Sequence, residues 1–483
     1  MNWGLLLNSL EVAGLTALGA GALGFGAALW LAGAPEPWRS WLLGTSIVAL
    51  VLPPWLVANC WLDIFGPASW VQAWLPVRLH SPVGAAWVLT LLTWPIAMLV
   101  VLGAWTGLQP SHLESEPNLR GTALVRWLLW PMARAALGQG LVIVFVLALN
   151  NFTVPTLLQV RVFPAEVWVR FNTNFDTAGA LALSWPLILA PGLLLVLLRC
   201  SGLAWPRLES DATAQAIRRQ LGTSWWLGCG AVTGLLLILS VAVPMMELVG
   251  TPRTWLELPA VLRTGQSAAA NSLWLAAATA TGCIGAGLLT WRWRMGLLLW
   301  LPFLVPGLLL GIGLIWLLNR PGLIGLYQSA GVVLLGLWLR YLALGWHGVA
   351  VALRGLDRDL VDAAQLEGAS GWQLLRWVHL PLAGRPIGMA WYMTYLLCLW
   401  DVETVVLIVP PGGETLALRI FNLLHYGHSA QVNALCVVML SLAVAPLALA
   451  RLALWGARAV TGPEHWASRP LAASAGSDAR ETS

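Results

Sequence analysis

The sequence of 483 residues contains no lysine, and charged residues of all kinds make up only 10% of it. A soluble globular protein carries about 25% charged residues. Hydrophobic residues make up 59%, so the polar groups are too few to cover a soluble fold of this length. This composition excludes a cytosolic enzyme, a disordered scaffold and a nucleic-acid binder, although the net charge is +5.

Two further absences narrow the chemistry. Without lysine, the chain cannot contain the Gly-rich phosphate-binding loop that ends in Lys-Ser or Lys-Thr. The six cysteines are scattered through apolar segments and form no Cys-x-x-Cys pair, which argues against a disulfide framework and a zinc site. We therefore expect no catalytic residues, no metal site and no cofactor bound by the chain itself.

What the sequence does contain is a series of long apolar segments. A membrane-spanning helix needs about 20 such residues. We predict an all-α, polytopic membrane protein with about 11 transmembrane helices. The first segment has no basic residue before it, so we interpret it as a retained helix and not as a signal peptide. The expected spans are 8–32, 41–61, 82–104, 134–158, 178–200, 224–246, 267–290, 295–318, 328–350, 386–410 and 430–456.

Arginine gives an orientation for these spans. All 26 basic residues are arginines, and with the expected spans 18 of them fall on one side of the bilayer, seven on the other, and Arg340 within a span. The richer side is predicted to be cytoplasmic. The N-terminus is then outside and the C-terminus cytoplasmic, with a tail at 457–483 that we predict to be disordered.

An internal repeat organises the chain. Asn8-Ser9-Leu10 opens the first span and Asn271-Ser272-Leu273 opens the seventh. An offset of 250 residues superposes Pro131 on Pro381, and Phe171-Asn172 on Phe421-Asn422. Chance similarity between apolar helices is the alternative explanation. We predict a duplication, with both copies in the same orientation around a central pathway.

The predicted domains follow from this repeat. The first repeat covers 1–200 with five helices, and the second covers 224–456 with six. A polar cytoplasmic linker at 201–223 joins them.

The most informative segment, 357–381, interrupts the spans with two short helical patterns that meet at a glycine. Its residues resemble the cytoplasmic coupling motif of ABC importer permeases, Glu-Ala-Ala-x3-Gly-x9-Ile-x-Leu-Pro. The spacing matches throughout, with Asp in place of Glu and Val in place of Ile. The matching residues are Asp362, Ala363, Ala364, Gly368, Val378, Leu380 and Pro381.

The first half carries a weaker version of this segment at 107–131. Gly121 and Pro131 stand where the motif needs a glycine and a proline, but three residues too close together. Glu116-Pro117 replaces the Ala-Ala pair, and the proline would disturb a short helix. We interpret this as a degenerate coupling loop.

The resemblance extends over nearly the whole chain, to the fused two-repeat permeases of type I ABC importers. It implies a bacterial inner-membrane subunit that forms a pathway and contacts a cytoplasmic ABC ATPase dimer, which binds ATP and Mg. It further implies an external solute-binding protein, with ferric iron as the first choice of cargo and thiamine, phosphonate or another anion as alternatives. An ion-gradient-driven secondary transporter is the competing interpretation, but it would need more charges inside the spans.

Polar residues inside spans predict the pathway. At the offset of 250, Asn151 corresponds to Asp401 and Thr153 to Glu403. Such groups are costly in a bilayer, so we expect them near an outer gate or, alternatively, in hydrogen bonds between helices. His425 and His428 have a spacing that could share a metal, but a docking surface or a plain loop is the favoured interpretation.

Overall fold

The computed structural model describes residues 3–36, 38–66, 78–105, 118–174, 211–293, 296–356, 358–425 and 429–461, with a few isolated positions between these ranges. Over these ranges the chain is helical and contains no strand. The protein is an all-α polytopic membrane protein, as its composition predicts.

Seven helices in the described ranges are long and apolar enough to cross a membrane, and each coincides with an expected span. Three of these spans contain an internal proline within a continuous helix: Pro95, Pro259 and Pro446. The seven are Trp3–Ala32, Pro82–Ala104, Thr122–Asn150, Thr223–Gly250, Pro252–Thr290, Ala330–Arg354 and Ala430–Leu452.

The other expected spans differ from single straight helices. The segment 41–61 is a pair, α2 (Trp38–Val51) and α3 (Pro54–Ile64), bent by 85° at Pro53-Pro54. The segment 295–318 is broken at Val305-Pro306 into α17 (Gly296–Leu304) and α18 (Gly307–Leu318). Proline lacks the backbone N–H that would continue the helical ladder, which explains both breaks.

The expected span 386–410 is also shorter than predicted. Helix α23 (Leu380–Leu399) ends before Asp401, and residues 403–408 form turns. The expected span 178–200 lies outside the continuously described residues.

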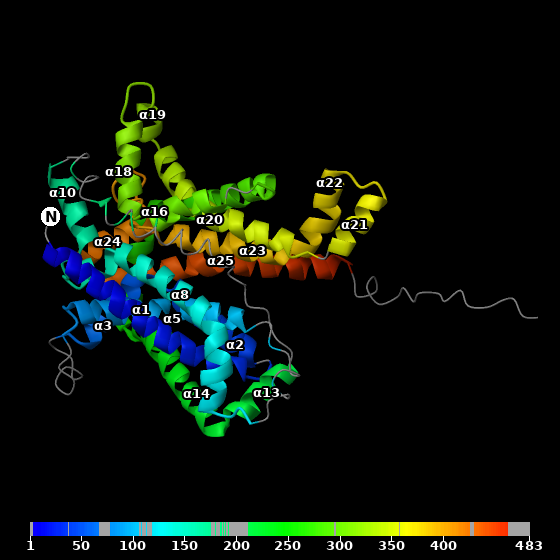
Figure 1. Ribbon diagram of the computed structural model, residues 1–483. Helices are drawn as coiled ribbons and strands as arrows, with labels where there is room; N and C mark the ends of the chain where they lie inside the picture. The colour runs from blue at the N-terminus through cyan, green and yellow to red at the C-terminus, as the bar shows by residue number, and fades with distance from the viewer. Residues whose placement is uncertain are drawn as a thin grey trace, which may run out of the picture. The chain divides into compact units, whose positions relative to one another are not determined.

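Three helices pack together in each half, in the same chain order. In the first half these are α1 (Trp3–Ala32), α5 (Pro82–Ala104) and α8 (Trp130–Asn150). In the second half they are α16 (Pro252–Thr290), α20 (Ala330–Arg354) and α23. Both groups are visible in Figure 1 as long helices that run beside one another.

A glycine allows the close approach of the first two helices in each group. A Cβ at Gly24 would lie 2.6 Å from the carbonyl oxygen of Trp94, and one at Gly287 would lie 3.1 Å from the Cα of Trp346. Close contact through small residues is the usual way in which membrane helices associate. The two glycines are 263 residues apart, the same separation as Asn8 and Asn271.

The Asn-Ser pairs make matching contacts. Asn8 donates to the carbonyl oxygen of Arg161 at 3.2 Å, and Ser9 Oγ accepts from the Phe163 amide at 2.8 Å. Asn271 likewise donates to the Glu414 carbonyl at 3.1 Å, while Ser272 Oγ accepts from the amide of Leu416 at 2.8 Å.

These contacts fix the starts of two short helices, α10 (Phe163–Asn174) and α24 (Leu416–His425). The starts are 253 residues apart, not 250. The Phe-Asn pairs at 171 and 421 therefore occupy positions three residues, or nearly one helical turn, apart in the two helices. The recurring contacts favour the predicted duplication, which stays a prediction.

Three π-helical turns occur in the described ranges, and each ends two residues before a proline. They are η1 (Val125–Leu129), η2 (Ile238–Ala242) and η3 (Leu374–His379). The prolines are Pro131, Pro244 and Pro381. Because proline cannot donate the usual i→i−4 hydrogen bond, the ladder changes to i→i−5 just before it.

Residues 1–438 form one compact unit, and residues 439–483 form a second. Helix α25 begins in the first unit and its later part belongs to the second. The remaining elements are α7 (Thr122–Leu124), α9 (Thr153–Leu157), α13 (Asp211–Leu221), α14 (Thr223–Leu237), α15 (Val243–Gly250), α19 (Ile324–Tyr327), α21 (Arg358–Leu366), α22 (Gly371–Gln373) and α25 (Ser429–Thr461).

Candidate functional site

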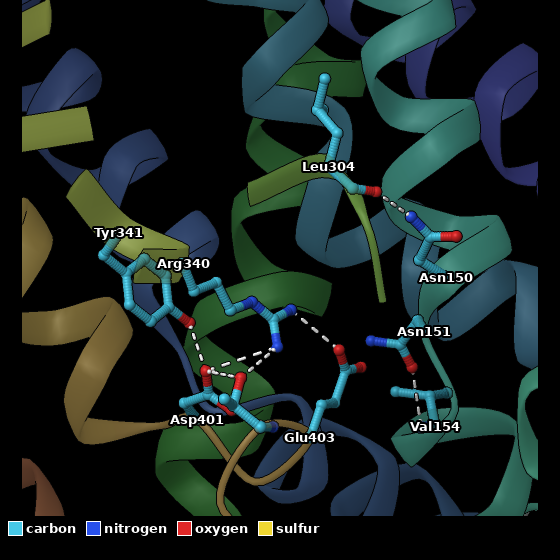
Figure 2. Close-up of polar contacts among 9 residues, drawn as sticks. Asn150, Asn151, Val154, Leu304, Arg340, Tyr341, Asp401 and Glu403 are labelled. Atoms are coloured by element: carbon cyan, nitrogen blue, oxygen red, sulfur yellow. Dashed lines mark hydrogen bonds and ion pairs between the residues drawn. The ribbon is translucent and has the colours of Figure 1, made fainter. Parts of the chain in front are cut away.

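A cavity of about 210 Å³ lies where the chain leaves α8 in one half and α23 in the other. All four residues that the sequence predicts for the pathway line it. Figure 2 shows Asn151 and Glu403 facing the same space from opposite halves. Whether solute passes here stays a prediction. The four predicted residues are Asn151, Thr153, Asp401 and Glu403.

The two walls of this cavity share one kind of hydrogen bond, from a backbone amide to a side-chain oxygen three residues earlier. Asn151 Oδ1 accepts a hydrogen bond from the amide of Val154, three residues on, at 3.0 Å. Asp401 Oδ1 accepts in the same way from the amide of Thr404 at 2.7 Å. In both places a short side chain ends a long helix by holding the next turn, as Asn and Asp commonly do.

The electrostatics of the two walls differ. On the second wall, Arg340 from α20 lies between two carboxylates: Nη2 is 2.9 Å from Glu403 Oε2, and Nη1 is 3.4 Å from Asp401 Oδ2. Only 1% of the Asp401 side chain is exposed, and 14% of the Arg340 side chain. Burial of charges is costly, so this cluster is stable only because the opposite charges are paired.

Hydroxyl groups complete the cluster. Tyr341 donates to Asp401 Oδ2 at 2.9 Å, and the Thr404 hydroxyl donates to the same oxygen at 2.7 Å. Arg340 Nη1 donates to Thr404 Oγ1 at 2.7 Å (Figure 2). Asp401 thus accepts hydrogen bonds at both of its oxygens, which is how buried carboxylates are normally satisfied.

Several polar atoms of lining residues have no hydrogen-bond partner among the described residues. Among them are Asn150 Oδ1 and Arg340 Nε, although Asn150 also donates to the carbonyl of Leu304 from the other half. Buried polar atoms are nearly always paired, so unpaired ones beside a cavity indicate room for a polar occupant.

Sequence reasoning found the carboxylates but missed three of their neighbours. The sequence predicts that Arg340 lies within a span but assigns it no role. It does not single out Tyr341 or Asn150 as pathway residues. The signal was available for the arginine: a charge inside one span needs an opposite charge inside another. No spacing rule could pair residues 340 and 401, because their contact depends on the packing of α20 against α23.

On the predicted cytoplasmic side, the coupling segment forms two short helices. Helix α21 ends at Leu366, and Gly368 then adopts φ of +83°, which other residues rarely adopt. The amide of Ala369 donates to the Ala364 carbonyl at 3.1 Å, so the turn closes the end of the helix. Ser370 begins α22 with a reciprocal capping box to Gln373.

The motif residues lie at the surface of this knob, the name we use for residues 358–381. Each of the seven is exposed or half-buried, and Ala364, Gly368 and Val378 line a shallow groove of about 350 Å³. Such a groove can accept side chains of another protein. Their coupling role stays a prediction for Asp362, Ala363, Ala364, Gly368, Val378, Leu380 and Pro381.

One histidine lies in the knob. His379 contacts Trp291 with ring centroids 6.0 Å apart. Burial lowers the pKa of His379, and nearby Arg292 lowers it further. The imidazole is therefore held in its neutral form near pH 7.

The first-half copy keeps the later part of this arrangement. Gly121 has φ of +55° and begins α7, and η1 and Pro131 follow as η3 and Pro381 do. The offset that superposes the prolines places Gly121 on Gly371 and not on Gly368. Glu116-Pro117, which the sequence marks as degenerate, lies outside the described residues.

Of the two histidines whose spacing could share a metal, His425 and His428, the second lies outside the described residues. Among the residues that the structure does describe, no three His, Cys, Asp or Glu side chains gather closely enough to hold a metal ion.

No family model matches the chain. Over 175 residues it is 28% identical to the putative 2-aminoethylphosphonate transport system permease protein PhnV of Salmonella choleraesuis (strain SC-B67), which covers 35% of this chain and 63% of that relative. Its relatives are transport permeases. Over 92 residues the chain is 34% identical to the spermidine/putrescine transport system permease protein PotC of Escherichia coli (strain K12). This match covers 19% of the chain and 35% of the relative.

These matches support the resemblance to permeases that the knob suggested. The chain spans less than two thirds of the length of these curated relatives. Neither name mentions iron or thiamine, so the relatives give no support to the cargo that the sequence favoured first.

Proposed function

We propose that the chain is the membrane-spanning permease subunit of an ATP-driven ABC importer of the bacterial inner membrane. The observation that carries this proposal is the cavity between the halves, where corresponding residues of each half, such as Asn151 and Asp401, face one space. A passage between two similar halves suits alternating access, in which the halves rock around a central site.

The knob supports the ATP-driven part of the proposal. Without lysine the chain cannot carry the usual nucleotide-binding loop. A separate cytoplasmic ATPase dimer therefore binds ATP and Mg and hydrolyses the ATP. The exposed groove beside Gly368 offers that ATPase a place to dock. An external binding protein delivers the solute, and the N-terminus is outside with the C-terminus in the cytoplasm.

For the cargo, we propose a small polar solute that carries an amino group. The solutes in the names of both relatives, 2-aminoethylphosphonate and spermidine/putrescine, contain amines. In the cavity two carboxylates face one guanidinium, which leaves one net negative charge when all are ionised. A negative cavity favours an ammonium group.

The test is reconstitution of the full chain in lipid with its ATPase and binding protein. We expect ATP hydrolysis to rise when 2-aminoethylphosphonate or putrescine is added, and not with ferric iron or thiamine. Stimulation by iron or thiamine alone would overturn the cargo. A chain that binds no ATPase and moves solute with an ion gradient would overturn the ABC assignment.

A Gly368→Pro variant tests the knob in the same system. Proline cannot adopt φ of +83°, so the turn between α21 and α22 must change. We expect normal assembly in the membrane but loss of solute-stimulated hydrolysis. Hydrolysis that stays coupled to uptake in a properly assembled variant would refute the role of the knob.

A further inference from the structure

Helix α13 in the linker packs against the start of the first half's degenerate coupling loop. One face of this helix is buried, with Ala214, Ile217 and Leu221 each at most 1% exposed. Gln215 and Arg219 are exposed on the other side. The described part of the linker, from residue 211 on, is therefore a docked amphipathic helix with one exposed face.

The contacts that hold α13 are specific. The amide of Gly121 donates to the carbonyl of Gln220 at 2.9 Å, and the Gln220 side chain donates to the carbonyl of Leu113. The Arg218 guanidinium lies 4.2 Å from the ring centroid of Trp226, a cation–π contact that holds the helix toward α14. The C-terminal end of α13 is thus joined to Gly121, in the turn that leads into α7.

The second half has a similar junction, made by residues close in sequence, although Gly368 lies three residues before the position that corresponds to Gly121. There α21 ends, turns at Gly368 and leads into α22, η3 and Pro381. In the first half, α13 ends beside Gly121, which leads into α7, η1 and Pro131. A helix C-terminus meets the start of an equivalent turn in both places, although in the first half the helix comes from about 100 residues further along the chain.

We propose that α13 is a second ATPase-contacting helix of this permease, which acts beside the degenerate coupling loop of the first half. This proposal rests on the proposed function. The occupant of its free face is the ATPase subunit, since the junction beneath α13 repeats the one beneath the knob. The linker therefore has a mechanical role: movement of the ATPase is passed to α8 through the contact between Gln220 and Gly121.

The two docking surfaces differ in the charges that they expose. The first helix of the knob and the turn after it expose Asp359, Asp362 and Glu367, whereas the C-terminal half of α13 exposes Arg218 and Arg219. Charges at the rim of an interface mainly determine which partner surface is accepted. The ATPase surfaces that receive the two helices should accordingly differ in charge, or one surface must tolerate both.

The test is photo-crosslinking in the full chain, embedded in lipid together with the ATPase subunit that copurifies with it. One sample carries p-benzoylphenylalanine in place of Gln215 on α13, and a second carries it in place of Gln365 on α21; both positions are exposed. A third, in place of the exposed Trp293 in the turn after α16, is the control on the same predicted side of the membrane.

We expect the ATPase subunit to be crosslinked from positions 215 and 365 but not from 293. A crosslink from 365 alone would overturn the role of α13 and leave the proposed function intact. If neither 215 nor 365 reaches the ATPase, the proposed function fails as well.

A variant with altered charge on the exposed face of α13 gives a second readout. We expect Gln215→Glu with Arg219→Glu to weaken binding of the ATPase to the chain by about tenfold, since charges at the rim of an interface determine which partner surface is accepted. Arg134→Glu, at an exposed arginine early in α8, should change binding by no more than about twofold. Equal effects of the two variants would mean that α13 contributes only general surface charge, and would contradict the proposal.

Discussion

The turn after α8 and the turn after α23 have the same backbone hydrogen bond but opposite electrostatic character. Asn151 and Asp401 each hold the amide three residues on, so either residue satisfies the local fold. Only the second wall adds Arg340 and a second carboxylate, Glu403. The two walls therefore share a backbone turn, whereas the buried ion pairs lie in the second wall. The turn can form without the charges, so the charges need a reason other than the local fold.

The largest expected effect comes from removal of the shared cation. Arg340→Met would leave Asp401 and Glu403 buried without a counter-charge, which costs about 3–5 kcal/mol. We expect a markedly lower melting temperature of the purified chain in lipid, measured by intrinsic tryptophan fluorescence.

The matched control removes the charges on both sides of the pair. Arg340→Met combined with Asp401→Asn and Glu403→Gln should regain most of the lost stability, because no unpaired charge remains. A triple variant as unstable as the single one would mean that the arginine stabilises through packing and not through charge.

An exchange of the capping residues between the walls should have an intermediate effect. Asp401→Asn keeps an acceptor for the Thr404 amide but loses the ion pair with Arg340, and we expect about 1–3 kcal/mol of destabilisation. Asn151→Asp keeps the acceptor for Val154 and adds a carboxylate to the half-buried wall, at a cost of about 1 kcal/mol. Thermal unfolding of both variants would check this order, and a larger loss at 151 would show that the two walls are more alike than their charges suggest.

The most local effect is expected in the knob. Gly368→Ala forces a side chain into positive φ, which costs about 1–2 kcal/mol locally. Gly371→Ala, three residues away, is the matched control, because that glycine has an ordinary backbone conformation and open space around it. Protease sensitivity of the knob should rise in the first variant only, and equal sensitivity in both would remove the special status of Gly368.

The sequence predicted the apolar helices well because their cause is local. Two spans differ from the prediction because prolines interrupt them. Hydropathy alone treats these apolar segments as continuous, but the helices break at Pro53-Pro54 and at Pro306. Helix α23 stops early because Asp401 captures the amide of Thr404, a contact whose signal is a single short polar side chain.

The candidate site was predictable in part. The offset between the halves brought Asn151, Thr153, Asp401 and Glu403 forward, and all four line one cavity. Arg340 could not be joined to them from spacing, because about 60 residues and several helices separate it from its partners. The contact between α13 and Gly121 could not be predicted from spacing either. The buried face of α13 is short, and its partner lies about 100 residues earlier in the chain.

The π-helical turns before Pro131 and Pro381 have a further consequence for rotational phase. Each successive residue of an α-helix turns about 100° around the axis. A π turn holds roughly one residue more than an α turn, so the helix beyond it begins about 100° out of phase with the residues before it. The direction in which α8 and α23 present their far ends to the cavity is therefore set by the number of residues in a turn at their opposite ends. Loss of a single residue there would rotate the whole of either helix and change which side chains face the cavity, without a substitution at any of them.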